Sequence, residues 1–211
     1  MEDQLYKNAG RALIIGSVLM VLTMILHPVG GDIHHLIRIS QVIIISHSLA
    51  IASIPINFYG FWGLTTKLGK TDIFSLLAFI IMGMSLLGAM LAASINGLAL
   101  PFFVDHYGEA NADTINAIHP VLEYSFALNK AMTIIYIVGS CLSVSLWSMA
   151  IIKQKSLPVW IGYLGLSLGV IAVILLLSGF VFNDLHGLRI FVVGNVVWTI
   201  LTAYSLIKAP N

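Results

Sequence analysis

The chain has 211 residues, of which 59% are hydrophobic and only 9% are charged. Since a typical soluble domain has about 25% charged residues, this composition indicates a membrane protein. The net charge of +1 excludes the basic stripe that nucleic-acid binding needs, and the single cysteine, Cys141, excludes an internal disulfide or a site built from several thiolates.

Six segments without Asp, Glu, Lys or Arg alternate with polar connections along the chain. Each has at least 18 residues, enough for an α-helix to cross about 30 Å of hydrocarbon. The sequence therefore predicts an all-α, polytopic membrane protein, a bundle of six transmembrane helices. No connection is long enough for a second domain, so residues 1–211 form one. The expected helices cover residues 10–28, 39–66, 72–104, 126–152, 157–183 and 187–207.

Local signals add detail to these helices. The first is predicted to end at His27-Pro28, because Pro and the glycines that follow stop a helix. Small residues recur at four-residue spacing over 88–97 in the third helix and over 162–169 in the fifth. Both stripes predict close packing between helices. Residues 112–120 are expected to form a short interfacial helix before the fourth span.

The distribution of Lys and Arg predicts the orientation of the bundle. Seven lie on the side that carries both termini and three on the other, and cytoplasmic loops are the ones enriched in these residues. We therefore expect both termini in the cytoplasm and the protein in the inner (plasma) membrane. All four tryptophans fall in the cytoplasmic half, where indole rings are favoured at the headgroup level. They are Trp62, Trp147, Trp160 and Trp198.

The outer side carries six of the seven histidines and six of the nine acidic residues. Neutral imidazole is the commonest metal ligand, and a catalytic zinc needs about three nitrogen or oxygen ligands. We expect at least two histidines and a carboxylate to converge on a divalent metal or a haem. The alternative is that polar residues gather there because hydrocarbon excludes them, and no His-Glu-x-x-His motif is present. The candidates are His27, His34, His35, His106, His119, His186, Asp105, Glu109 and Asp184.

Three cations suggest an anion site on the same side. Arg38, Lys130 and Arg189 lie near the amino ends of the second, fourth and sixth helices, where the helix dipole also favours negative charge. Together they could hold an anion such as a lipid phosphate. The alternative is that each reaches the interface separately or pairs with a nearby acid.

Four polar residues within the apolar segments predict an internal cavity. His47, Asn96, Tyr136 and Asn195 are expected at a similar depth in the outer leaflet. An ionisable group at that depth is costly and should face the interior of the bundle. The alternative is a cluster that satisfies its own hydrogen bonds. No second histidine is expected at the depth of His47, which argues against a deeply buried bis-histidine haem.

The fifth-helix entry LPVWIGYLGLSLG and the His27-Pro28 ending resemble small, uncharacterised six-helix bacterial membrane proteins, a resemblance that implies no activity. Three functions stay open. The protein binds a metal, haem or small ligand in an outward-facing site, as a binding protein or an enzyme. It is a small transporter that uses the His47 cavity. Or it is an accessory subunit of a membrane complex. We favour the first, because coupled carriers usually bury an acid and no apolar segment contains one. The expected partners are membrane lipid, a small-molecule or lipid ligand and other membrane proteins.

Overall fold

The computed structural model describes residues 2–182 and 184–208, and every regular element in them is helical. Six helices are long and apolar enough to cross a membrane, which confirms this part of the prediction. Two short elements lie between or within them. The helix α2 follows the first long helix, and a π-helical turn, η1, leads from α4 into α5. The elements are α1 (Glu2–Leu26), α2 (Ile33–Arg38), α3 (Ser40–Lys67), α4 (Ile73–Ser94), η1 (Ile95–Ala99), α5 (Leu100–Asp105), α6 (Ala112–Gln154), α7 (Val159–Leu177) and α8 (Leu185–Lys208).

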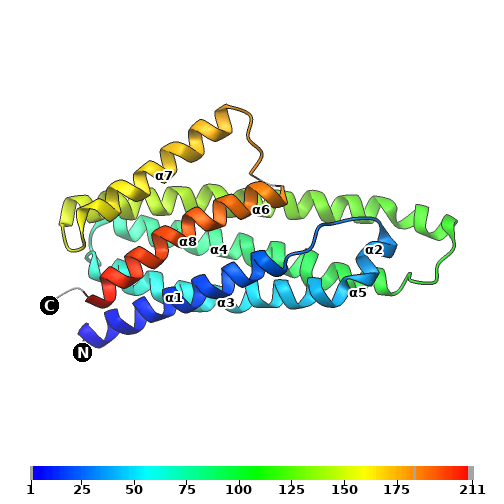
Figure 1. Cartoon of the computed structure of the whole chain (residues 1–211), viewed down its shortest axis with the longest axis horizontal. Coiled ribbons are helices and arrows are strands. Elements are labelled where there is room, and N and C mark those ends of the chain that lie inside the picture. The colour runs from blue at the N-terminus through cyan, green and yellow to red at the C-terminus, as the bar shows by residue number, and fades with distance from the viewer. Residues whose placement is uncertain (1, 183, 209–211) are drawn as a thin grey trace.

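The long helices lie along one axis, with the start of α1 and the end of α8 at the same end of the bundle (Figure 1). We call this the terminal end and the opposite one the distal end. α1 packs against α3 and α8, and α4 packs against α6. α7 packs on α6 and leans away from the bundle as it runs from the terminal end (Figure 1). At the distal end, α2, α5 and the first turns of α6 extend beyond α1 and α8 (Figure 1).

The predicted stripes of small residues lie at helix contacts. A Cβ on Gly88 of α4 would lie 3.2 Å from the carbonyl oxygen of Met132 on α6, and one on Gly165 of α7 would collide with the Ser148 hydroxyl of α6. Such close backbone approach favours association in lipid, where no hydrophobic drive brings helices together.

A stack of aromatic rings closes the terminal end. The Trp147 ring lies 4.8 Å from the Phe61 ring and 6.3 Å from the Trp198 ring, centroid to centroid. The Trp147 indole donates to the Thr65 hydroxyl at 3.0 Å, and the Trp198 indole donates to the Ile161 carbonyl at 3.2 Å. Both tryptophans are fully buried. Both rings therefore face the interior of the bundle, because each indole N–H finds its partner on a neighbouring helix.

Asp72 forms a second contact at the terminal end. Its carboxylate caps α4 by accepting from the Ser75 backbone N–H at 3.0 Å and pairs with Lys153 of α6 at 3.1 Å. Burial alone would raise the pKa of the Asp72 carboxyl, but the bond from Ser75 and the pairing with Lys153 outweigh it and hold that pKa below its usual range. The short α3–α4 connection is thereby tied to the end of α6.

The fourth predicted helix begins earlier than expected. No separate interfacial helix forms over 112–120, because α6 is continuous from Ala112 to Gln154 and contains Pro120. Its 43 residues span about 64 Å, far more than the hydrocarbon thickness. The side chain of Asn111 caps it by accepting from Thr114 N–H at 2.9 Å. The first turns of α6 pack against the distal end of the bundle, because Ile118 and Leu122 are buried in an apolar cluster with residues of α2, α3 and α5. We call it the distal cluster.

The fifth predicted helix ends earlier than expected. α7 stops at Leu177 rather than at 183, since Gly179 adopts a φ of +87° and ends the helix. The backbone N–H of Gly179 bonds the Leu176 carbonyl at 3.1 Å, and that of Phe180 bonds the Leu175 carbonyl at 2.9 Å. This pair of bonds is a Schellman motif, which glycine favours because it has no Cβ. At the other end of the chain, the first helix begins earlier than predicted, at Glu2 rather than near residue 10.

We expect the aromatic stack to dominate the stability of the terminal end. Trp147→Ala removes a fully buried ring and should lower the free energy of unfolding by about 3–5 kcal/mol. Trp147→Phe keeps the stacking but loses the bond to Thr65, so its effect should be smaller. Thermal unfolding of the purified protein in detergent, followed by circular dichroism, measures both. Trp160→Ala is the control, because that ring is 52% exposed; equal losses for Trp147→Ala and Trp160→Ala would contradict the role of the stack.

Candidate functional site

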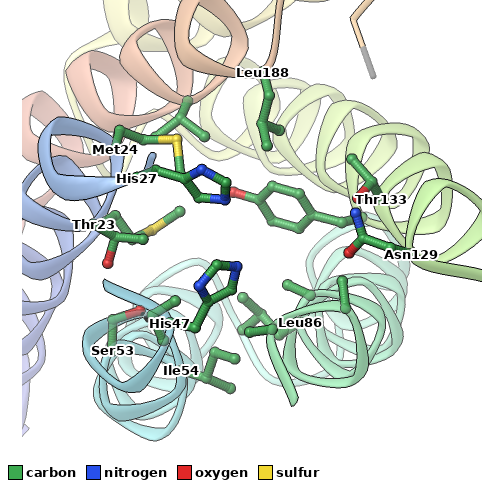
Figure 2. A pocket seen from close by; sticks show the side chains of 17 residues that line it. Thr23, Met24, His27, His47, Ser53, Ile54, Leu86, Asn129, Thr133 and Leu188 are labelled. Atoms are coloured by element: carbon green, nitrogen blue, oxygen red, sulfur yellow. Dashed lines mark hydrogen bonds between the residues drawn. The ribbon is translucent and has the colours of Figure 1, made fainter. Parts of the chain in front are cut away.

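A cavity of about 120 Å³ lies in the distal half of the bundle, between α1, α3, α4, α6 and α8 (Figure 2). We call it the main cavity because two histidines line it; a cavity of about 150 Å³ between α6, α7 and α8 is larger, and none of the described histidines lines it. Within the described part of the chain, none of its lining residues is Asp, Glu, Lys or Arg, and its wall is mostly apolar. The groups that can bind a ligand are two imidazoles, a thioether, a phenol, an amide and a hydroxyl. They belong to His27, His47, Met24, Tyr136, Asn129 and Thr133. The lining also includes Met20, Thr23 and Ser53, whose sulfur and hydroxyls already bond Asn57, the Leu19 carbonyl and the Ala50 carbonyl.

The two histidines form a close pair in this cavity. Their ring centroids are 4.7 Å apart, with an angle of 53° between the ring planes, and both rings point into the cavity (Figure 2). The expectation that His47 has no second histidine at its depth is therefore wrong. His27 follows the last residue of α1, yet its ring lies against α3 inside the bundle.

Backbone carbonyls set the protonation of both rings. His47 Nδ1 lies 2.8 Å from the Ile43 carbonyl oxygen, and His27 Nδ1 lies 3.0 Å from the Pro28 carbonyl oxygen. Because a carbonyl oxygen only accepts, each Nδ1 carries the proton, and each Nε2 keeps its lone pair. Burial lowers the pKa of the His27 imidazole, and the charge of Arg189 lowers it further, against the opposing effect of the Pro28 bond. His27 is therefore neutral near pH 7, with Nε2 available to a ligand.

Arg189 of α8 fixes the end of α1 beside this pair. Its Nε donates to the Met24 carbonyl at 3.2 Å, and its Nη2 donates to the His27 carbonyl at 3.0 Å. Carbonyls in the last turn of a helix lack intrahelical partners, and a cation at that end is favoured by the helix dipole. The guanidinium thus positions the backbone of two cavity residues without entering the cavity lining.

The π-helical turn η1 gives His47 its place. Gly97 in this turn packs so closely on His47 that an added Cβ would collide with the histidine Cβ and ring. Only glycine therefore fits at this position. π-Helical turns inside α-helices are often found at functional sites. Asn96, from the same turn, accepts a hydrogen bond from the Ser125 hydroxyl of α6 at 3.3 Å, so η1 joins α3 to α6.

A second, smaller cavity lies next to the main one on the side of the terminal end. Its volume is about 20 Å³, above the roughly 10–15 Å³ that one water needs. Tyr136 and Met20 line both cavities. Asn57, 2% exposed, lines the small one, and its Oδ1 has no hydrogen-bond partner, while its Nδ2 lies 3.5 Å from the Met20 sulfur. The small cavity can therefore hold one water that binds Asn57.

The four residues predicted to share a cavity are only partly brought together. His47 and Tyr136 line the main cavity, and Tyr136 and Asn195 line the small one. The Asn195 amide donates to the Phe191 carbonyl of its own helix at 3.2 Å. Asn96 lines neither of these cavities, because its side chain turns towards Ser125.

The predicted metal centre on the outer side is not found. Among the described residues, no three His, Cys, Asp or Glu side chains lie close enough to hold a metal ion. The polar groups are satisfied locally: Asp184 caps α8 through the Gly187 N–H at 2.6 Å, and His119 pairs with Glu123 on the surface of α6 at 3.6 Å. The other candidates are exposed or half-exposed: His34, His35, His106, His186, Asp105 and Glu109.

The three cations predicted to hold an anion take different roles. Arg38 and Lys130 are exposed on α2 and α6, whereas Arg189 binds the carbonyls at the end of α1. None of the three lines the main cavity. Instead of pairing with Asp184, Arg189 satisfies a helix end.

No protein-family model, curated protein or solved structure matches this chain, so its site is inferred from its own residues. The His27–His47 pair, the place of Met24 and the polar wall of α6 were not predicted from the sequence. One signal was available: Asn129, Thr133 and Tyr136 follow the i, i+4, i+7 spacing of a single helix face within a predicted span. Thr23 on α1 and His27 just beyond it are also four residues apart.

We expect Gly97→Ala to disturb the site, because its Cβ would collide with His47. Overpacking of this kind costs about 1–3 kcal/mol, so the melting temperature in detergent should fall. Gly30→Ala is the matched control, since nothing lies within 4 Å of the added Cβ, and it should melt like the wild type. An unchanged melting temperature for Gly97→Ala would argue against the contact between η1 and His47.

Proposed function

We propose that the protein is a multi-pass membrane protein that binds a small ligand in the main cavity. The surface of the bundle supports insertion into lipid: Leu177 is 82% exposed and Ile25 is 68% exposed. The interior is polar by comparison, since Ser85 of α4 bonds Ser140 and the Tyr136 carbonyl of α6 at 2.8 Å each. Apolar groups outside and hydrogen-bonded polar groups between helices are the arrangement that a lipid solvent favours.

The proposed orientation places both termini in the cytoplasm and the main cavity in the outer half of the membrane. The excess of Lys and Arg in the connections at the terminal end supports it. The distal end, with α2, α5 and the start of α6, then faces outward.

The pair of imidazoles in the main cavity is the observation that carries the binding function. Each Nε2 has a lone pair and no hydrogen-bond partner within the described residues, and leaving such a group unpaired away from water costs about 1–3 kcal/mol. A helix contact that served packing alone would not need two histidines in one cavity. Bound to a ligand, the two Nε2 atoms lose this penalty.

The geometry also narrows the class of ligand and function. A haem is far larger than a cavity of about 120 Å³, and rings 4.7 Å apart leave no room for a macrocycle between them. The buried stack of Phe61, Trp147 and Trp198 at the terminal end opposes the passage of an ion or a solute through the bundle. A binding site reached from one side is therefore favoured over a channel.

The orientation is tested with single cysteines on a Cys141→Ser background. Glu109 and Lys70 are both exposed, on the connections of the distal and terminal ends. We expect Glu109→Cys to react with an impermeant maleimide in intact cells, and Lys70→Cys to react only after the cells are permeabilised. The reverse pattern would overturn the orientation.

Access to the main cavity is tested with Thr133→Cys on the same background. A small charged methanethiosulfonate, added to the outer side of sealed vesicles, should modify this cysteine, because the proposed site admits small molecules from that side. Val138→Cys is the control on the same helix, because Val138 is 52% exposed on the apolar surface and a thiol in lipid ionises poorly. Adding Ala93→Leu, a larger residue in the cavity wall, should slow the modification. If Thr133→Cys reacts no faster than Val138→Cys, the cavity does not admit ligands from that side.

A further inference from the structure

The main cavity combines two nitrogen ligands with a sulfur ligand. Besides the imidazoles of His27 and His47, the thioether of Met24 lines it, and Figure 2 draws Met24 and His27 on the same wall of the cavity. We infer that the ligand of the proposed binding site is a monovalent copper ion, Cu(I), held by His27 Nε2, His47 Nε2 and Met24 Sδ.

The spacing of the imidazoles suits one shared ion. Two imidazoles bound to a metal at about 2.0 Å have ring centroids about 5 Å apart at trigonal or tetrahedral angles and about 6 Å apart when they lie opposite each other. The observed 4.7 Å is close to the first arrangement, which leaves a coordination position for a third ligand. The Nδ1–H bonds to the carbonyls of Ile43 and Pro28 are the outer contacts that usually orient metal-binding histidines.

The charge of the surroundings selects a monovalent ion. No acidic side chain lines the cavity within the described residues, and Arg189 binds the His27 carbonyl at 3.0 Å. The cost of taking an ion out of water rises with the square of its charge, so a divalent ion here would lack compensation. Thioether ligands favour soft ions, and among biological metals that combination points to Cu(I) rather than Zn(II).

Met24 is favoured over its neighbour Met20 as the sulfur ligand. The Met20 sulfur lies 3.5 Å from the Asn57 amide nitrogen, which donates to it from the side of the small cavity. Within the described residues, no hydrogen bond engages the Met24 sulfur. The backbone of Met24 is also held by Arg189, through its carbonyl at 3.2 Å.

The test uses the purified full-length protein in detergent without oxygen, with Cu(I) as the probe. A chromophoric Cu(I) chelator, bathocuproine disulfonate, competes for the ion and reports the affinity, and X-ray absorption reports the ligand atoms. We expect one Cu(I) per chain, with nitrogen and sulfur scatterers. Met24→Leu should lose the sulfur scatterer and weaken binding about tenfold or more, and His27→Gln should weaken it as well. Met82→Leu is the matched control, because Met82 is 3% exposed in the core and does not line the main cavity.

Each outcome of this experiment decides the assignment. Stoichiometric Cu(I) binding that Met24→Leu weakens and Met82→Leu preserves supports it. Loss of the sulfur scatterer in Met20→Leu instead would overturn the choice of Met24. Binding of Zn(II) as tight as that of Cu(I) would overturn the argument from charge. Absence of Cu(I) binding, with Thr133→Cys still reactive from the outer side, would end the copper inference and leave the proposed binding function standing. If Thr133→Cys is unreactive as well, both fail.

Discussion

The rest of the bundle depends on the aromatic stack of Phe61, Trp147 and Trp198 at the terminal end. Hydrocarbon offers no partner for an indole N–H, so each tryptophan must find an acceptor on another helix. Thr65 and Ile161 supply these acceptors at 3.0 and 3.2 Å, and the two bonds link α6 to α3 and α8 to α7. Since large buried rings fill the terminal end, the helices are held together there and can diverge towards the distal end.

The distal half has the opposite character, because it is built from helix ends and irregular turns. α1 stops before His27, η1 replaces a regular turn opposite His47, and a separate apolar cluster around Leu36 and Val104 lies beyond them. Between the distal cluster and the terminal stack, regular packing is interrupted, and the main cavity occupies that interruption. Gly97 of η1 packs on His47, which lines the main cavity, so the irregular turn positions the cavity wall without lining it.

The sequence predicted the helical class because apolar length is a property of each segment alone. It also identified His47 and Tyr136, since a polar residue inside an apolar segment must face the interior. It could not place His27, because the distance between two helix ends depends on how α1 meets α3, and its polar neighbours suggested a surface loop. The role of Arg189 was not predicted for a related reason. A cation near a helix end is expected at the membrane interface or on an anion, whereas its partners here are carbonyls at the end of α1. Contacts between segments decide such cases, and no single segment contains them.

The position of Arg189 connects the proposed ligand site to the rest of the bundle. It binds the carbonyls of Met24 and His27, which supply two of the three proposed ligand groups. It belongs to α8, a helix of 24 residues that spans about 36 Å and carries Trp198 in its middle. A ligand that draws His27 and Met24 together therefore acts on α8 through the guanidinium. Because the Trp198 indole is bonded to the Ile161 carbonyl of α7, any shift of α8 must be absorbed between Arg189 and this anchor. Between Arg189 and Trp198, α8 borders the main cavity through Val192, the small cavity through Asn195, and a further cavity of about 150 Å³ through Gly194. The packing of this stretch therefore leaves room for such movement.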